Sequence, residues 1–428
     1  MALARPEFRR GGGTRPSGQP RWAVWAAAGV CLLALAAYLV GVVLRHSGQM
    51  LDWYDLNVYN HAGLMARSAP RRLYTWQLQP GIRFTYTPFS ALVFAVCSLL
   101  PWAVLRWLMT VTSLAALAVT LWLTLGALGW RGRQRVTLVA GVAAASLWTE
   151  PVQRALHLGQ IELLLMVLIV WDMGQPDRRW WKGAGVGLAA GIKLVPLIFI
   201  PYLVLAGKLR QAAAVTAAFL GTVVIGFVFL PQTSANYWLT GYFLRSRNVG
   251  AVQSLLNQSL LGLVARAIGS LRYATPVWLA VGVVIVVLGS VAAAVLDRAG
   301  HTVAGWLTCA LTGLLVSPIS WDQHWIWVVP AIALFADAAL RADRAARWAW
   351  WGLAVAVAGL LGAWGTVPLG EVHPLPGHLR PISENLFVLV GLVLLAVAIG
   401  AAAHQRVKRM TGNGQAVTQN LDHVMTRV

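Results

Sequence analysis

Acidic residues are scarce in this sequence, in which 14 Asp and Glu stand against 34 Lys and Arg over 428 residues. Charged residues of both signs make up 11% of the chain, whereas a soluble domain contains roughly 25%. So low a charge content excludes a soluble globular protein of ordinary composition. The carboxylates also form no cluster along the chain of the kind that holds a catalytic cation, and we therefore predict that no metal is used.

Cysteine is nearly absent as well, and the spacing of a metal site or a redox pair is missing. A glycine-rich phosphate loop is missing too. Gly183, Gly185 and Gly187 fall in an apolar run, which is typical of closely packed helices. We therefore expect no cofactor. The isolated cysteines are Cys31, Cys97 and Cys309.

Apolar runs of about 20 residues recur from one end of the chain to the other. They predict an all-α polytopic membrane protein whose membrane domain covers 23–403, between cytoplasmic tails at 1–22 and 404–428. The first tail is rich in Arg, Gly and Pro, and we expect it to be disordered. About twelve membrane helices fit the pattern, near 23–45, 102–128, 135–150, 160–175, 182–193, 194–206, 211–230, 275–297, 302–317, 325–341, 347–366 and 385–403.

Clusters of Lys and Arg indicate the orientation, because basic loops favour the cytoplasmic side of a membrane. The net charge of +20 then reflects topology, and we predict no nucleic-acid partner. Residues 88–100 are apolar but short, so we expect a re-entrant or juxtamembrane helix on the outer face. The basic clusters are "RGRQR" (131–135), "PDRRWWK" (176–182), "GKLR" (207–210), "RADRAAR" (341–347) and "HQRVKR" (404–409).

Several basic residues lie where this orientation disfavours them. Arginines that reach lipid headgroups are one explanation, and a pocket for a lipid-linked phosphate is the other. Lys193 lies within an apolar stretch, at a cost of about 2.5 kcal/mol or more. We expect a helix break between Gly191 and Pro196, with Lys193 near the apex of a shallow hairpin. The outer arginines include Arg67, Arg71, Arg72, Arg83, Arg154, Arg245 and Arg247.

The stretch "WYDLNVYNHAG" (53–63) follows the first apolar run and contains Asp55, with Asp52 directly before it. We expect Asp52 to lie at a helix end. A carboxylate at the membrane surface can act as general base on a hydroxyl within hydrogen-bond reach, and Asp55 is our candidate. A structural role in a cap or loop is the alternative.

Further polar residues gather on the predicted outer face. His324 lies in the Trp-rich "SPISWDQHWIW", whose aromatic faces suit a sugar or a prenyl chain. A second outer helix begins near "HLGQIE", and helix N-termini favour anions. Each motif is weak by itself, but their convergence on one face predicts a site there. The other members are His157, Gln160, Asn257, Gln258 and Ser259.

Together these segments resemble the GT-C superfamily of polyprenol-phosphate-sugar glycosyltransferases, in particular its actinobacterial α-(1→2)-mannosyltransferases. The likeness covers residues 23 to about 400. Glu162 departs from the pattern, because the resemblance leads us to expect Asn there. The likeness rests on "DLNVY", "FTYTPFSALVF", "HLGQIE", "GIKLVP", "LLNQSLLG" and "SWDQHWIW" in this order.

The resemblance implies an inverting transfer of mannose at the outer face of the cell membrane. The donor would be a polyprenyl-phosphate mannose, the acceptor a glycolipid or lipoglycan, and membrane lipids would surround both. It implies Asp55 as catalytic base and His324 as the active-site histidine, and our candidates for the donor phosphate are Lys193, Arg245 and Arg247. The candidates for substrate binding are Asn57, Tyr59, Tyr86, His157, Gln160, Asn257 and Gln258.

Two other functions stay open from the sequence. A transferase of another polyprenyl-phosphate sugar, such as arabinose, would leave the same pattern. A transporter or lipid flippase would concentrate ionisable groups at mid-membrane. Here Lys193 stands almost alone in the membrane while the outer loops are rich in polar residues, which favours an enzyme.

Overall fold

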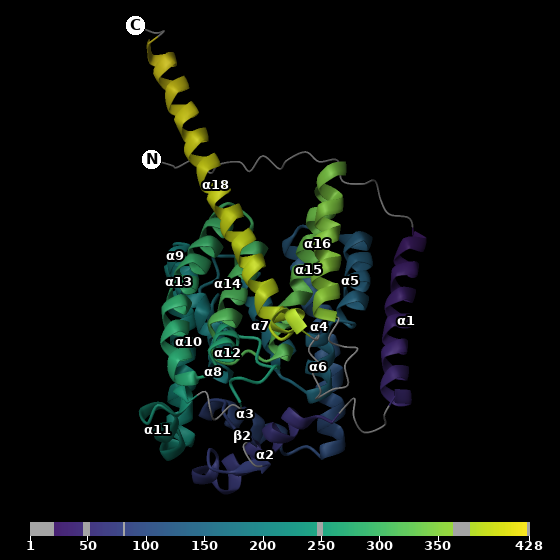
Figure 1. Cartoon of the computed structure of the whole chain (residues 1–428), viewed down its shortest axis with the longest axis vertical. Coiled ribbons are helices and arrows are strands. Elements are labelled where there is room, and N and C mark those ends of the chain that lie inside the picture. Colours follow the sequence, from purple (N-terminus) through teal and green to yellow (C-terminus); the bar gives the residue numbers. More distant parts are fainter. Residues whose placement is uncertain (1–20, 46–51, 80–81, 246–250, 363–376, 426–428) are drawn as a thin grey trace.

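Apolar helices run roughly side by side through the body of the molecule (Figure 1). The computed structural model describes residues 21–45, 52–79, 82–245, 251–362 and 377–425. Within these residues, five helical segments are long and apolar enough to cross a membrane, or six if the bent pair α6–α7 is one span. The five are α4 (Trp102–Ala127), α10 (Leu209–Phe229), α13 (Leu271–Arg298), η5 (Asp322–Trp327) continued by α15 (Val328–Arg341), and α18 (Leu386–Met425).

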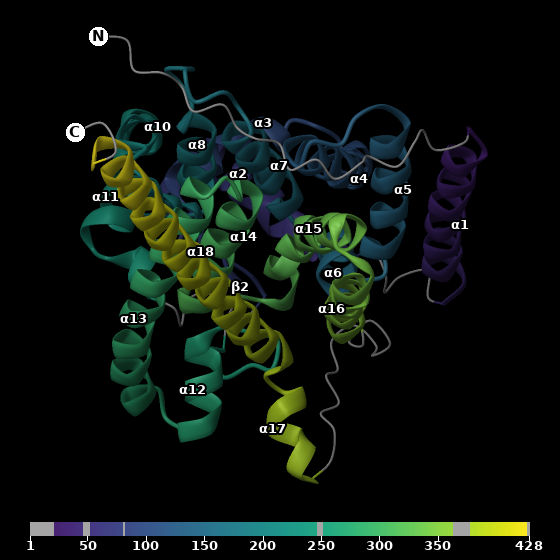
Figure 2. The same ribbon diagram turned by 90° about the horizontal axis from the view of Figure 1, so that it is seen from above.

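Helices also occupy the remaining predicted positions, but several are only 7 to 15 residues long. A straight crossing needs about 20 residues, so length and composition show five or six spans where about twelve were predicted. Seen from above, α1 lies at the edge beside α5, and α16 lies beside α15 (Figure 2). These helices are α1 (Arg21–Arg45), α5 (Gly132–Ser146), α6 (Glu150–Leu158), α7 (Glu162–Met173), α8 (Ala184–Ile192), η2 (Val195–Ile198), α9 (Phe199–Leu205), α14 (Thr302–Val316) and α16 (Arg344–Gly362).

Lys193 lies at the break between α8 and η2, as the sequence predicted. Its backbone is extended, with φ −137° and ψ 125°, and this conformation ends α8. Both arms of the segment pack on α10. The start of α8 at Gly183 lies against the backbone of Gln211, and α9 leads into Lys208 at the same end of α10. The segment is therefore a short hairpin with Lys193 at its apex.

Glycine and one buried carboxylate make this hairpin pack closely. Gly183 precedes α8 with φ 110°, a conformation that favours glycine. The carboxylate of Asp172 accepts hydrogen bonds from the backbone N–H groups of Gly183 and Val186, each at 3.0 Å. At Gly187 a Cβ would collide with the backbone of Val215 on α10. The glycines of this run are packing residues, as predicted.

Short elements form a layer at one end of the molecule (Figure 1). α3 packs on α2 and matches the short helix expected over 88–100. An antiparallel pair of very short strands, in which Gln77 pairs with Arg83, was not predicted. The layer comprises α2 (Tyr54–Ser68), η1 (Pro70–Arg72), β1 (Gln77–Gln79), β2 (Ile82–Arg83), α3 (Pro88–Cys97), α11 (Pro231–Leu239) and η3 (Tyr242–Leu244). The short helix α12 (Leu260–Ile268) lies nearer the middle of the molecule (Figure 1).

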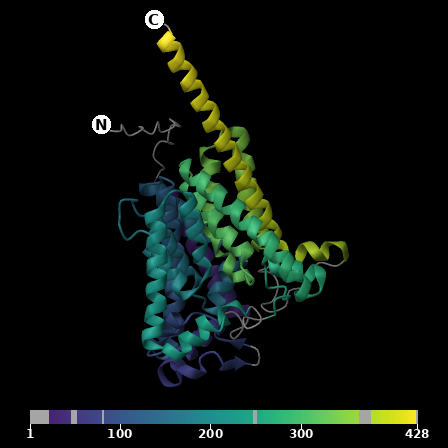
Figure 3. The ribbon, with the colours of Figure 1, turned by 90° about the vertical axis from the view of Figure 1, so that its left-hand side faces the viewer.

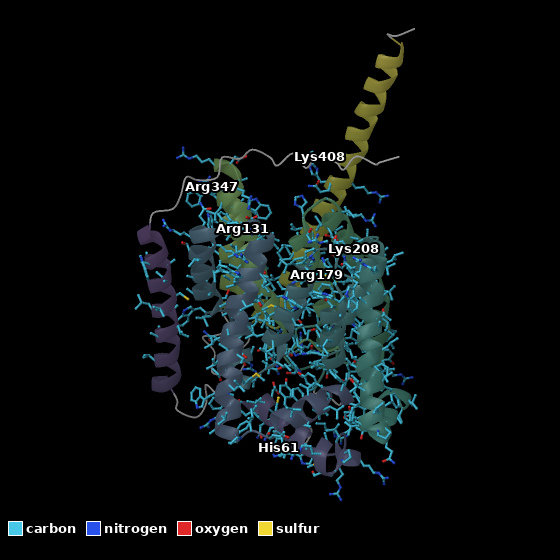
Figure 4. The ribbon with its side chains drawn as sticks, turned by 180° about the vertical axis from the view of Figure 1, so that it is seen from behind. His61, Arg131, Arg179, Lys208, Arg347 and Lys408 are labelled. Carbon is cyan, nitrogen blue, oxygen red and sulfur yellow. The ribbon has the colours of Figure 1, made fainter. Side chains whose placement is uncertain are left out.

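The predicted basic clusters gather at the opposite end. Figure 4 shows one residue from each cluster there, far from His61 of α2. Loops separated by hundreds of residues thus share one end, in agreement with the alternation predicted from the basic residues. The labelled cations are Arg131, Arg179, Lys208, Arg347 and Lys408.

α18 is longer than the predicted span, because it continues past residue 403 to Met425 and rises beyond the other helices (Figure 3). The C-terminal tail expected over 404–428 therefore starts as helix. Helix α18 is preceded by η7 (Gly377–Leu379) and α17 (Arg380–Ser383). Of the N-terminal tail expected over 1–22, residues 1–20 lie outside the described residues.

Candidate active site

Asp55 lies in the first turn of α2, in the layer of short elements. Asp52 lies at the start of this helix, as expected, where its Oδ1 accepts a hydrogen bond from the backbone N–H of Tyr54 at 2.9 Å. Trp53 has a left-handed backbone with φ 48°, and its N–H donates to the carbonyl oxygen of His157 at 3.0 Å. The start of α2 is thereby tied to the end of α6.

Gln160 joins Asp55 to Tyr59. Its Nε2 donates to Oδ2 of Asp55, and its Oε1 accepts from the Tyr59 hydroxyl at 2.7 Å. Asp55 and Tyr59 are four residues apart, and residues at this spacing share one face of a helix. The Tyr59 hydroxyl lies 2.8 Å from that of Tyr86. This chain of contacts fixes the direction of the Asp55 carboxylate.

The turn between α6 and α7 brings Gln160 this close to α2. The two helices are bent by 117°, and Gly159 ends α6 with φ 65°. A Cβ on Gly159 would lie 2.8 Å from Cβ of Leu56. Glycine is needed here for both its backbone conformation and the close approach of the two segments.

A second cluster consists of Glu162, Lys193 and His324. Nζ of Lys193 donates to Oε1 of Glu162 and lies 2.8 Å from Nε2 of His324. The same Nε2 is 3.3 Å from Oε1 of Glu162. Glu162 is only 6% exposed. Nζ of Lys193 also lies 5.6 Å from the ring centroid of Tyr86, so the two clusters meet at Tyr86.

The electrostatics of the first cluster suit a general base. Burial raises the pKa of Asp55 to about 7, and the negative charge of Glu162 acts in the same direction. The hydrogen bond from Gln160 and the charge of Lys193 oppose this rise. Burial also acts to raise the pKa of Asp52, but His157 lowers it below its usual value by a hydrogen bond and by charge. Of these two carboxylates, Asp55 is therefore the one poised to exchange protons near neutral pH.

Two cavities adjoin the second cluster. A small one of about 60 Å³ is lined by Glu162, Lys193 and His324 together with apolar side chains. A larger one of about 690 Å³ lies among α14, α15, α16 and α18 and is mainly apolar. Leu314 and Trp327 line both. Asp337, Arg341 and His301 also line the large cavity, but its walls are otherwise mainly apolar and offer room for a hydrocarbon chain.

The remaining candidate residues lie outside these two clusters. His157 is buried, with Nε2 3.5 Å from Oδ2 of Asp52. Asn57 lies two residues after Asp55 and so on a different side of α2, and its backbone oxygen is 3.0 Å from Nδ1 of His61. Arg245 is exposed and donates to the carbonyl oxygen of Thr240 at 3.2 Å. Arg247 lies outside the described residues.

Asn257 and Gln258 are completely buried, and their side chains bond to backbone groups. Oδ1 of Asn257 accepts from the N–H of Ser320 at 3.0 Å. Oε1 of Gln258 accepts from the N–H of Phe387 at 3.1 Å. These contacts fix the segment that leads to His324 and the start of α18.

The sequence did not indicate the ion pairs that surround His324. Glu162 was noted only as a departure from the expected pattern, although its rarity as a carboxylate in an apolar run is a usable signal. The pair of Arg154 with Asp322, at 3.3 Å, ties α6 to η5 and was not foreseen. Among the described residues, no three His, Cys, Asp or Glu side chains could hold a metal ion together, and the absence of a metal in catalysis stays a prediction.

The comparison with known families shows that this helical chain is a glycosyltransferase. Residues 84–318 match glycosyltransferase family 87. The chain belongs to this family. The matched region contains Gln160, Glu162 and Lys193, whereas Asp55 and His324 flank it.

Three relatives illustrate the likeness. Polyprenol-phosphate-mannose-dependent alpha-(1-2)-phosphatidylinositol pentamannoside mannosyltransferases of Mycobacterium tuberculosis (strain CDC 1551 / Oshkosh) and Mycolicibacterium smegmatis are 32% and 30% identical, over 333 and 308 residues. These matches cover 76% of both chains in the first case, and 70% of this chain and 73% of the relative in the second. A polyprenol-phosphate-mannose-dependent alpha-(1-2)-phosphatidylinositol mannoside mannosyltransferase of Mycolicibacterium smegmatis is 29% identical over 399 residues, 87% of each chain. No solved structure matches significantly.

Proposed function

We propose that this chain transfers mannose from a polyprenyl-phosphate donor to a glycolipid or lipoglycan acceptor at the outer face of the cell membrane. The transfer inverts the anomeric centre and forms an α-(1→2) linkage. The observation that carries this proposal is that Gln160 holds the Asp55 carboxylate next to the cluster around Lys193. The names of the relatives support the donor, the linkage and a phosphatidylinositol mannoside as acceptor.

In the proposed reaction, Asp55 removes the proton from a 2-hydroxyl of the acceptor. The hydroxyl oxygen forms a bond to the anomeric carbon of mannose as the bond from that carbon to the phosphate oxygen breaks. The electron pair leaves with the polyprenyl phosphate, and the proton stays on Asp55. Inversion to an α product requires a β-linked donor.

The donor phosphate fits at the second cluster. Lys193 supplies a fixed positive charge and His324 a hydrogen-bonding nitrogen, and both can stabilise the charge that develops on the leaving phosphate. The N-terminus of α7 begins at Glu162, and helix N-termini favour anions. The prenyl chain would lie in the larger cavity, whose walls include Trp325 and Trp327, both shortly after His324 in sequence.

The acceptor would approach along α2, where Asn57, Tyr59, Tyr86 and His157 are candidates for contact with its sugars. Arg245, which directly follows η3, and Arg247 would meet the charged headgroup of the donor or of a neighbouring lipid. The short apolar helices would complete a membrane domain of about twelve passes, with the basic end (Figure 4) in the cytoplasm.

The test is mannose transfer by the purified full-length protein, with polyprenyl-phosphate mannose and a mannosylated phosphatidylinositol. The wild type should form product, and Asp55→Asn should lower the rate by about 10³-fold. Asp52→Asn is the matched control, since this carboxylate lies at a helix end, and its rate should stay within about threefold.

No transfer by the wild type would reject the mannosyltransferase, and an unaffected Asp55→Asn would reject the base. Movement of labelled lipid across vesicles without a new glycosidic bond would identify a flippase instead.

A further inference from the structure

The carboxylate of Glu162 lies where a phosphate is expected to bind. Its Oε1 accepts a hydrogen bond from Lys193 and lies 3.3 Å from Nε2 of His324. Its Oε2 is buried, and among the described residues no hydrogen-bond partner faces it. All three side chains line the same small cavity. An anion that reaches this pair of nitrogen atoms therefore meets a fixed negative charge.

We propose that Glu162 makes this site discriminate between the phosphodiester of the sugar donor and the phosphomonoester of the spent lipid, so that the product leaves. This inference rests on the function proposed above and assigns a role to a residue that does not take part in bond breaking. Glu162 acts as a specificity-determining residue through its charge at the phosphate site.

The argument depends on counting charges. The donor phosphodiester carries one negative charge, and the monoester left after transfer carries nearly two above its second pKa of about 6. Lys193 and Glu162 together sum to zero charge, so the site attracts a monoanion weakly. The added charge of the product is repelled by a carboxylate a few ångströms away, and the low polarity around a buried group strengthens this repulsion.

Glu162 is held in place for this role. It begins α7, where the helix N-terminus stabilises a negative charge. Ile169 and Met166, on the same helix, line the cavity behind it. The carboxylate is therefore held at the site, in contact with Lys193.

The test compares the affinities of two lipids that differ by one charge, decaprenyl phosphate and its methyl ester, for the full-length protein in detergent. Binding is measured at pH 8, where the two lipids differ in charge, and at pH 5, where each carries about one negative charge. In Glu162→Gln we expect the monoester to bind about tenfold more tightly relative to the diester at pH 8. At pH 5 the ratio of the two affinities should equal that of the wild type.

Two further variants separate charge from structure. Glu162→Asp keeps the carboxylate and should retain the wild-type preference. Glu384→Gln removes an equal charge from an exposed pair with Arg380 and should leave the ratio unchanged. Thermal unfolding in detergent shows whether each variant is folded, and if Glu162→Gln is not, Glu162→Asn provides the same measurement.

An unchanged affinity ratio in folded Glu162→Gln at pH 8 overturns the inference, as does an equal loss of affinity for both lipids, which would show that Glu162 only positions Lys193. Because neither lipid carries mannose, this outcome is independent of the transfer assay. A wild type that discriminates between the lipids but transfers no mannose would reject the function and not the charge effect.

In a transfer assay, Glu162→Gln should show stronger inhibition by added decaprenyl phosphate, with about a tenfold lower inhibition constant. If tighter binding of the product slows its release, turnover and the KM for the donor should fall by a similar factor, so that kcat/KM stays close to the wild-type value. A purely structural defect would lower turnover without strengthening inhibition by the product.

Discussion

Nζ of Lys193 lies 2.8 Å from Nε2 of His324, although the two residues are 131 positions apart in the chain. The break after α8 presents Lys193, and the segment before α15 presents His324. Glu162 contacts both, and Tyr86 links this cluster to the one around Asp55. The proposed general base and the proposed phosphate site are thereby held within one connected set of side chains.

Removal of the lysine charge should separate activity from stability. Lys193→Gln should lower the transfer rate by about 10²-fold to 10³-fold, because the leaving phosphate loses a fixed cation. It should also lower the melting temperature, since Glu162 is left buried without its counter-charge. The double variant Lys193→Gln, Glu162→Gln should recover the melting temperature but not the transfer. Recovery of transfer would contradict the role of Lys193.

The rate of transfer should depend on pH through Asp55. A base must be ionised, and the pKa of Asp55 is raised to about 7, so the rate should rise from pH 5.5 and level off above about pH 8. Measurement of kcat/KM across this range at constant ionic strength tests it. A rate that is flat between pH 5.5 and 8 in a stable protein would show that Asp55 does not titrate there.

The same raised pKa affects stability with the opposite sign. The folded pKa of about 7 lies above the usual 3.8, so the folded state binds the proton more tightly. The contribution of Asp55 to the free energy of unfolding therefore falls as pH rises from about 4 to about 7. At pH 8, Asp55→Asn should melt at the wild-type temperature or about 1–3 °C above it, whereas at pH 4.5 this advantage should shrink. A loss of several degrees at pH 8 would contradict the prediction.

Gln160 should tune the base without carrying out a chemical step. The hydrogen bond from Gln160 holds Asp55 and lowers the pKa of this carboxylate. Gln160→Leu removes the bond, so the pKa of Asp55 should rise. We expect the rate to fall by about 10-fold to 100-fold and the acid limb of the pH profile to move above about 7. Tyr59→Phe breaks only the contact behind Gln160 and should have a smaller effect. An unshifted profile in Gln160→Leu would remove Gln160 from this role.

Gly159 offers a test of how the site is assembled. Gly159→Ala places a Cβ 2.8 Å from Leu56, at φ 65°, and should cost about 1–3 kcal/mol and reduce transfer. Gly269→Ala is the matched control, because Gly269 also has a positive φ of 74° but nothing within 4 Å. Its cost should be about 1 kcal/mol, with activity retained. Equal effects of the two variants would show that the approach of α2 to the turn after α6 is not critical.

The helices were largely predictable because bilayer-length apolar runs leave few alternatives. The break at Lys193 was predictable too, since Gly191 and Pro196 flank a charge that an apolar helix does not tolerate. Length and composition show five or six spans, and the count of about twelve stays a prediction, because hydropathy does not distinguish a full crossing from a short helix packed inside the bundle. The pair β1–β2 was missed because strands this short leave no periodic pattern.

The site was only partly predictable. The positions of Asp55, Lys193 and His324 could be selected because polar residues are rare in an apolar chain. Their mutual contacts could not, because loops far apart in sequence meet only after the helices have packed. Asn257 and Gln258 illustrate this limit of sequence-based prediction. Their motif resembled a binding segment, but their side chains form hydrogen bonds with backbone groups.

The sequence by itself determined that the chain is a bundle of membrane helices with its basic loops at one end, because hydrophobicity and charge act locally along the chain. Only the tertiary structure decided which polar groups face one another. The pairing of Glu162 with Lys193 and of Gln160 with Asp55 depends on a 117° bend and on the close approach that Gly159 allows. Those are properties of packed backbones, and no local pattern encodes them.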